Sequence, residues 1–162
     1  MNCKGLSIAL GGGLLVLTLL PGLAMADVMN YPGSICEPEG RDNVGYIARN
    51  YQGAFNYHYQ QSDRKVVCPV VRKNPYTTSG ARSIRVRIKR QSGAGSRAVS
   101  CEAVARDVRG REVSSSGTRS TTQYGNSELY FTLGQSAYLG SFEVRCTLPY
   151  ESGVLGYSVS EY

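Results

Sequence analysis

Few residues in this sequence have side chains that could carry out acid–base chemistry. There is one histidine, His58, in the stretch NYHYQQ, and the densest carboxylate cluster is Glu37, Glu39 and Asp42 in CEPEGRD. A glycoside hydrolase needs only two carboxyl groups, one on each side of the bond it cleaves, so these acids leave carbohydrate hydrolysis as one hypothesis. An acidic turn after a cysteine is the alternative interpretation, and the sequence places no nucleophile or orienting acid beside His58.

Other catalytic motifs are missing from the sequence. It contains no G-x-S-x-G serine elbow, no H-E-x-x-H motif, no P-loop and no dinucleotide-binding glycine pattern. A single histidine excludes a histidine-rich metal site, and the cysteines are too far apart for the close pairs that bind zinc. We therefore predict a protein with no enzymatic activity, no cofactor and no metal.

A row of cations alternates with apolar residues in SIRVRIKR, where Arg85, Arg87 and Lys89 occupy every second position. This is the period of a β-strand with one buried face, and long cations suit the solvent-facing side of such a strand. The other interpretation is a binding site, because the row would be about 13 Å long and could meet phosphates or sulfated sugars. Three more arginines near the same hairpin would widen the row: Arg82, Arg90 and Arg97.

A second candidate binding segment interleaves tyrosines with amides between residues 45 and 61. Such residues stack on sugar rings and hydrogen-bond their hydroxyls, or anchor a protein partner. A strand with exposed tyrosines is the alternative, and the absence of tryptophan argues against a strong sugar-stacking platform. The candidate contacts are Tyr51, Asn56, Tyr57, His58 and Tyr59.

The first 26 residues have the pattern of a signal peptide. Lys4 provides a positive charge, an apolar run follows, and Ala24-Met25-Ala26 matches a cleavage site. An uncleaved anchor is the alternative, because the apolar run is about long enough to span a bilayer. We predict cleavage, one domain over residues 27–162 without a further membrane span, and a periplasmic or extracellular location.

Four cysteines remain after the predicted signal peptide: Cys36, Cys68, Cys101 and Cys146. In an exported chain an even number of cysteines predicts disulfides, and four allow three pairings. We favour Cys36–Cys68, which would join a loop-rich N-terminal segment to a strand. We also favour Cys101–Cys146, because both of these cysteines share a face with predicted core residues.

The dominant apolar period is two residues, which predicts strands and little helix. The stretches RAVSCEAVARD, ELYFTL and SFEVRCTLP each place apolar side chains on one face. Pro69 in VVCPVVR predicts an edge strand or a bulge, and GVLGYSVSEY predicts Leu155, Tyr157 and Val159 on one face. Together these strands and the intervening turns predict an all-β fold, an antiparallel two-sheet β-sandwich of jelly-roll or Ig-like topology with two disulfides.

Four motifs occur in order along the chain: VVCPVVR, SIRVRIKR, VSCEAVARDVRGREV and FEVRCTLP, followed by YSVSEY at the end. In this respect the sequence resembles a group of small secreted bacterial proteins with a C-P-V/I-x-R strand, an R-D-x-x-G turn and a C-x-L-P segment. The resemblance implies a two-disulfide β-sandwich of unassigned activity, and it supplies no active-site residue.

These observations predict an exported binding or structural module of the bacterial envelope or extracellular space that contacts anionic or hydroxyl-rich polymers such as polysaccharides. One alternative is a module for an envelope protein partner, such as an adhesin subunit or an inhibitor of a periplasmic enzyme. The other is the carboxylate-pair hydrolase. The formal net charge of +6 favours solubility and loose attraction to anionic surfaces, and by itself it does not identify a partner. Nucleic acid is not expected, because export separates the chain from it and the basic and aromatic residues lie in different segments.

Overall fold

The structure is a computed structural model that describes residues 28–57 and 62–161. The predicted signal peptide and the candidate residues His58 and Tyr59 therefore lie outside the described part of the chain. Strands account for 57% of the structure and helix for 6%, and the strands form two antiparallel sheets. The predicted all-β fold is confirmed.

The first sheet, sheet A, has β12 at its centre. β12 pairs with β6 along one edge, and along its other edge it pairs first with β4 and then with β1. The strand order is β10–β6–β12–β4–β3, with β1 also on β12. Its strands are β1 (Val28–Pro32), β3 (Ile47–Asn50), β4 (Gly53–Asn56), β6 (Ala81–Arg90), β10 (Gly125–Phe131) and β12 (Ser152–Glu161).

The second sheet, sheet B, has β11 at its centre and the order β2–β5–β11–β7–β8, with β9 also on β7. Its strands are β2 (Glu37–Pro38), β5 (Arg64–Val70), β7 (Val99–Arg106), β8 (Glu112–Ser115), β9 (Arg119–Thr121) and β11 (Ser141–Leu148). The two-residue β2 covers only part of β5. Pro69 lies beyond that part, so the residue that cannot donate to a ladder stands at an open edge, as predicted.

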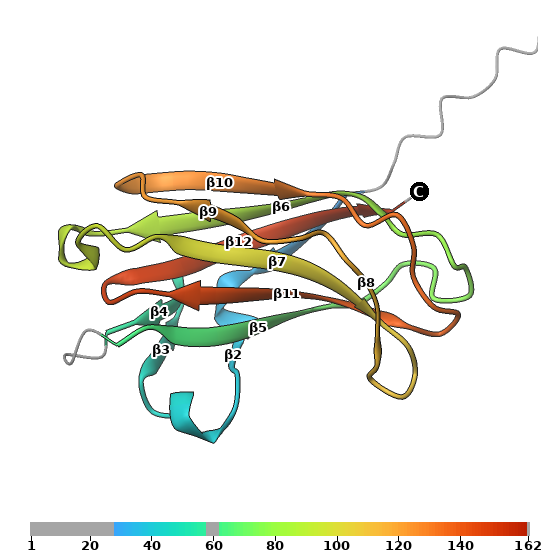
Figure 1. Cartoon of the computed structure of the whole chain (residues 1–162), viewed down its shortest axis with the longest axis horizontal. Helices are drawn as coiled ribbons and strands as arrows, with labels where there is room; N and C mark the ends of the chain where they lie inside the picture. Colours follow the sequence, from blue (N-terminus) through green and yellow to red (C-terminus); the bar gives the residue numbers. More distant parts are fainter. Residues whose placement is uncertain (1–27, 58–61, 162) are drawn as a thin grey trace, which may run out of the picture.

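The connections between the sheets identify the topology. From β4 onward the chain crosses repeatedly from one sheet to the other, which places β4–β12–β6–β10 against β5–β11–β7–β8 (Figure 1). These eight strands, four from each six-stranded sheet, have the jelly-roll topology. Of the two sandwich topologies that the sequence allowed, the structure therefore has the jelly roll.

The core lies between the sheets and consists of the inward residues that the two-residue period predicts. The confirmed sets are Val99, Cys101, Ala103 and Ala105 in β7, Leu129, Phe131 and Leu133 in and after β10, and Phe142, Val144, Cys146 and Leu148 in β11. The prediction for β12 is wrong at Leu155, which is only partly buried, while Val154 takes the core position. The cause is an irregularity in the β12–β6 register between Val154 and Gly156, which shifts the alternation by one residue.

Both favoured disulfides are present. Cys101 and Cys146 stand directly opposite each other on β7 and β11, with 4.1 Å between their Cα atoms. Cys36 precedes β2 and is bonded to Cys68 of β5, with a Cα–Cα distance of 4.0 Å. All four cysteines are buried in the core. Disulfides persist in oxidising compartments, so the two bonds indicate an exported protein.

Helix is confined to three short 3₁₀ turns, η1 (Gly33–Ile35), η2 (Arg41–Asn43) and η3 (Ser92–Ala94), within residues 28–57 and 62–161. No helix in that part of the chain has the length and hydropathy needed to cross a membrane.

Two buried arginines hold the loops at opposite ends of the sandwich. Arg72, which follows β5, donates to the carbonyl oxygens of Ala137 at 2.9 Å and Thr77 at 3.0 Å, and its guanidinium lies over the ring of Phe142. Arg90 donates to the carbonyl oxygens of Thr122, Gly95 and Arg97. The prediction that Arg90 widens the basic row is therefore wrong, because this side chain points inward and its guanidinium hydrogen-bonds to backbone carbonyls.

Candidate functional site

The cation row lies on the outer face of sheet A. Arg85, Arg87 and Lys89 point away from the core along β6, while the residues between them are fully buried. This confirms that the alternation marks the solvent-facing side of a strand. Because β6 lies between β10 and β12, the row runs along the interior of the sheet face and not along an edge.

The residues of β12 beside this row have small side chains, so the long cations of β6 project above the neighbouring surface. Arg85 is opposite Ser158 and Arg87 is opposite Gly156 in the β6–β12 register. A Cβ atom at Gly156 would lie 3.0 Å from a guanidinium nitrogen of Arg87. The Arg87 side chain therefore extends across β12 at a position where no side chain blocks it.

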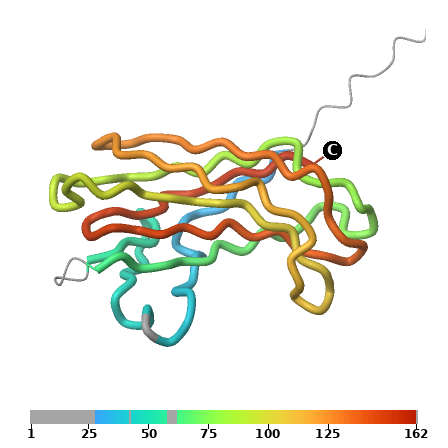
Figure 2. Tube along the Cα trace, viewed as in Figure 1, coloured from blue at the N-terminus to red at the C-terminus, as the bar shows by residue number. Residues whose placement is uncertain are grey.

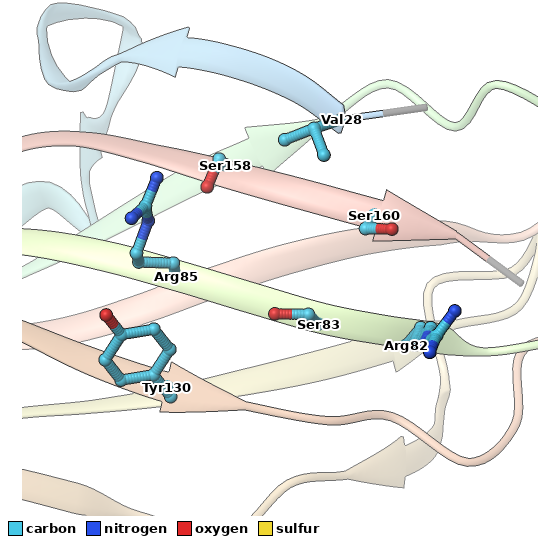
Figure 3. Close-up of a pocket in the computed structure, with 7 residues that line it drawn as sticks. All are labelled: Val28, Arg82, Ser83, Arg85, Tyr130, Ser158 and Ser160. Atoms are coloured by element: carbon cyan, nitrogen blue, oxygen red, sulfur yellow. The ribbon is translucent and has the colours of Figure 1, made fainter. Parts of the chain in front are cut away.

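A shallow concavity of about 350 Å³ lies beside Arg85 on this face. Figure 3 shows a floor of three serines between β6 and β12, with Arg85 toward one end and Arg82 at the other. Tyr130 of β10 forms one side and Val28 of β1 forms the other. The floor serines are Ser83, Ser158 and Ser160.

The hydroxyl groups of the floor are available for a ligand. Ser158 and Ser160 are each only 8% exposed. Within the described residues, none of the three floor hydroxyls has a hydrogen-bond partner in the protein. These hydroxyls reach the solvent in the concavity, so a ligand group that enters it can accept hydrogen bonds from them.

One carboxylate lies next to the concavity. Glu128 of β10 is 3.8 Å from a guanidinium nitrogen of Arg85, and it accepts a hydrogen bond from the hydroxyl of Tyr130. Both partners of the ion pair are partly exposed, so their attraction is screened by water. In the described part of the chain, Arg82, Arg87 and Lys89 have no carboxylate at ion-pairing distance.

The outer face of sheet B is different because its central arginines are paired with carboxylates. Glu143 lies between Arg106 and Arg145, at 2.7 Å from each. Arg145 also has Glu102 at 4.0 Å and Glu39 at 3.9 Å. Arg106 and Arg145 are thus compensated within the protein, although Lys65 and Arg119 of sheet B have no described carboxylate partner. On sheet A, three of the four cations of the row have no such partner.

Of the other arginines expected to widen the row, Arg82 lines the concavity, but Arg97 does not join it. Arg97 instead makes a 3.0 Å ion pair with Asp63. Together with the inward-pointing Arg90, this limits the cation row to Arg82, Arg85, Arg87 and Lys89.

The tyrosine–amide segment does not form one surface. Tyr51 is 93% exposed at the tip of the β3–β4 hairpin. Asn56 is fully buried and its amide donates to the carbonyl oxygens of Ser62 and Leu148, both at 2.8 Å, so it is a structural residue and not a ligand contact. Tyr57 stacks on Phe55 with 5.6 Å between ring centroids.

The carboxylates considered for hydrolysis lie elsewhere. Glu37 is exposed on β2, and Glu39 is an ion-pair partner of Arg145 on the outer face of sheet B. The side chain of Asp42 is outside the described part of the structure. Among the described residues, no group of three or more potential ligands is placed to hold a metal ion.

A separate surface at one end of the sandwich combines exposed tyrosines with aliphatic side chains. The loop after β5 and the loop before β11 lie side by side there (Figure 2), with Tyr76 and Tyr138 6.0 Å apart between ring centroids. Leu139 is exposed with a positive φ of 55°, and its N–H donates to the carbonyl oxygen of Pro75 at 2.6 Å. Arg72 contacts both loops, which fixes this surface in place.

Sequence reasoning identified the cation row but missed the concavity beside it. The missed residues are Val28, Ser83, Tyr130, Ser158 and Ser160. The signal that was available is the alternation in YSVSEY, which puts two serines on the outward face of the last strand. Their position beside Arg85 depends on the pairing of β12 with β6, which the sequence pattern does not contain.

Comparison with known proteins adds little to this geometry. No family model and no curated protein matches the chain. A solved structure of a GH26-CBM35 β-(1,4)-mannanase from Podospora anserina is similar at a TM-score of 0.48 and 13% sequence identity. The match covers 85% of this chain and 28% of the mannanase chain, so this chain spans less than a third of that protein.

Proposed function

We propose that this protein is an exported, non-enzymatic binding module for anionic polymers, and that it binds them on the outer face of sheet A. The observation that supports the proposal is the contrast between the two faces. Arg106 and Arg145 at the centre of sheet B are paired with carboxylates, whereas Arg82, Arg87 and Lys89 on sheet A have no described carboxylate partner. Unpaired cations held in a row on a rigid sheet attract a chain of negative charges.

The spacing of the row suits an extended polymer. Residues two apart on a strand are separated by about 7 Å, so Arg85, Arg87 and Lys89 offer evenly spaced charges along β6. Guanidinium groups also bind phosphate, sulfate or carboxylate oxygens through two parallel hydrogen bonds. A polymer lying along β6 would meet several cations at once, and its binding would weaken steeply as salt increases.

Binding of purified residues 27–162 to dextran sulfate and to unmodified dextran, at two salt concentrations, tests the proposal. We expect binding to dextran sulfate alone, with lower affinity at high salt. The double variant Arg85→Glu, Arg87→Glu should bind about tenfold more weakly or worse. The matched control is Lys65→Glu, Arg119→Glu, which makes the same charge change at exposed positions of sheet B strands and should bind nearly as well as the unmodified protein.

Equal loss in the two double variants would show that net charge alone drives binding, and it would contradict a site on sheet A. Failure to bind any anionic polymer at low salt would contradict the proposed function as a whole.

A second function, recognition of a protein partner, is supported by the exposed Tyr76, Tyr138 and Leu139 on loops that Arg72 fixes. Exposed aromatic residues on a rigid support are typical of protein interfaces. Cross-linking in an envelope extract tests this function. Capture that is lost in Tyr76→Ser, Tyr138→Ser and retained in Arg85→Glu, Arg87→Glu would favour the loop surface over the sheet A face.

A further inference from the structure

We infer that the concavity between Arg82 and Arg85 binds a tetrahedral monoester group, a sulfate or phosphate carried by the polymer. This inference rests on the proposed function, because it names the chemical group that the sheet A face recognises. It adds a subsite that is separate from the attraction exerted by the row as a whole. The residues that form it are Arg82, Ser83, Arg85, Ser158 and Ser160.

The donors of the concavity match the acceptors of such a group. Three serine hydroxyls form the floor, and guanidinium groups stand toward its two ends (Figure 3). A sulfate or phosphate monoester presents three terminal oxygens, each of which accepts more than one hydrogen bond. A carboxylate or a phosphodiester presents only two such oxygens. A monoester can therefore accept hydrogen bonds from all three hydroxyls and both cations, whereas a carboxylate or a phosphodiester has fewer oxygens to do so.

The strand register sets the hydroxyl spacing to the size of a tetrahedral ion. Ser83 and Ser160 are directly paired across β6 and β12, which puts their Cβ atoms about 5 Å apart. Ser158 lies two residues from Ser160 on the same face, about 7 Å away. A donor that hydrogen-bonds an oxygen of a tetrahedral ester lies about 4 Å from the central atom. Two donors on different sides of the ion are then separated by about 5 to 7 Å, which matches the spacing of the three serines.

The unpaired hydroxyls and the flanking charges of the concavity explain why the ester group would be preferred to water. The side chains of Ser158 and Ser160 face the concavity, and their hydroxyls have no hydrogen-bond partner among the described residues. A charged acceptor forms stronger hydrogen bonds to these hydroxyls than water does, and Arg82 and Arg85 supply the compensating charge. The same hydroxyls would contribute nothing to a polymer held only by its net charge.

The concavity also has room for the sugar that carries the ester. Its volume of about 350 Å³ exceeds that of a sulfate ion and falls in the range of small-molecule sites. Tyr130 and Val28 form its sides, and both are about half exposed. A pyranose ring bearing the ester would lie between them, with the ring of Tyr130 as its apolar contact.

The test compares three dextrans of matched charge density, carrying sulfate, phosphate monoester or carboxymethyl groups. The unmodified protein should bind at least one of the two monoester polymers about fivefold or more tightly than carboxymethyl dextran, and the arm that binds tighter identifies sulfate or phosphate. Ser158→Ala, Ser160→Ala should remove this preference and leave the affinity for carboxymethyl dextran unchanged. Ser83→Ala, at an exposed position, is a second variant that should reduce the preference.

Ser100→Ala on the outer face of sheet B is the matched control, since its hydroxyl pairs with that of Ser120 and lies outside the concavity. Equal affinity for all three polymers would overturn the inference and leave the proposed function standing. An equal loss for all three polymers in the folded serine variants would overturn it in the same way. Absence of binding to every one of the polymers would instead overturn the proposed function.

Discussion

The phenolic hydroxyl of Tyr157, in the central strand of sheet A, donates a hydrogen bond to the carbonyl oxygen of Pro69, in the edge strand of sheet B. Tyr31 of β1 stacks on Tyr157 with 5.0 Å between ring centroids, and its hydroxyl donates to the carbonyl oxygen of Val71 at 2.6 Å. The two tyrosines thus join the sheets along the side where β5 has no long neighbouring strand. The carbonyls that they use belong to Pro69 and to a residue just after β5.

This pair of tyrosines predicts a loss of stability at alkaline pH. Burial, followed by the nearby Tyr31, raises the pKa of the Tyr157 phenol well above its ordinary value. The folded chain therefore keeps this proton at pH values where the unfolded chain releases it, so the stabilisation is complete below about pH 10 and declines above it. Urea unfolding at about pH 8 and about pH 11 measures the decline.

Tyr157→Phe should lower the free energy of unfolding by about 1 kcal/mol at neutral pH and should show a smaller decline at alkaline pH than the unmodified protein. Tyr51→Phe at the exposed hairpin tip is the control and should behave like the unmodified protein. Parallel alkaline declines for Tyr157→Phe and the unmodified protein would show that Tyr157 does not account for the effect.

Arg72→Leu should destabilise the fold strongly. Burial lowers the pKa of Arg72, while Glu161, 3.9 Å away, raises it. Removal of the guanidinium deletes the hydrogen bonds by which it joins the two loops at Ala137 and Thr77 and leaves Glu161 without this ion-pair partner, so we expect a loss of about 3 kcal/mol in the free energy of unfolding. Arg109→Leu, at an exposed turn, should change it by less than about 0.5 kcal/mol. Similar small losses in both variants would contradict a structural role for Arg72.

The disulfides should each contribute several kcal/mol to stability. The bonds span 32 and 45 residues along the chain. For loops of this length the chain-entropy estimate is about 4 kcal/mol each. Cys101→Ala, Cys146→Ala should therefore unfold at a much lower urea concentration than the unmodified protein. Titration of purified residues 27–162 with a thiol reagent should detect no free sulfhydryl, and a reactive thiol would contradict the two-disulfide framework.

Glu128→Gln should increase the affinity for an anionic polymer. The substitution removes a negative charge 3.8 Å from Arg85 and keeps an oxygen that can accept the hydrogen bond from Tyr130. Because the pair is partly exposed, we expect an increase of about two- to fivefold at low salt that fades at high salt. Glu112→Gln, at an exposed position on β8, is the control. An affinity that is unchanged or decreased in Glu128→Gln would show that Arg85 does not contact the polymer.

The strands and disulfides could be predicted because their signals are local. The two-residue alternation around Cys101 and Cys146 places both cysteines inward, and that is where the structure has them. Leu155 was assigned to the wrong face because a register irregularity in the β12–β6 pairing leaves no mark in the hydrophobic pattern.

The candidate site could be predicted only in part, for a related reason. Arg85 and Arg87 are neighbours along one strand, so their alternation reveals their common face. Ser83 and Ser160 come together only through the pairing of strands that are far apart in the sequence. Arg90 directly follows Lys89, so the two-residue alternation places it on the inward face with Ile88, where the carbonyls of Gly95 and Thr122 accept hydrogen bonds from its guanidinium. The sequence pattern thus indicates the face on which Arg90 lies, but it does not identify the loop carbonyls that accept its hydrogen bonds.

Nuclear magnetic resonance titration of purified residues 27–162 with a sulfated oligosaccharide locates the binding surface most directly. The backbone amide shifts of β6, β10 and the second half of β12 should move in a concentration-dependent way, with the largest changes at Arg85, Ser158 and Tyr130. The amides of β5, β7 and β11 in sheet B should stay in place. Shifts centred on sheet B or on the loops around Tyr76 and Tyr138 would contradict an anion-binding face on sheet A.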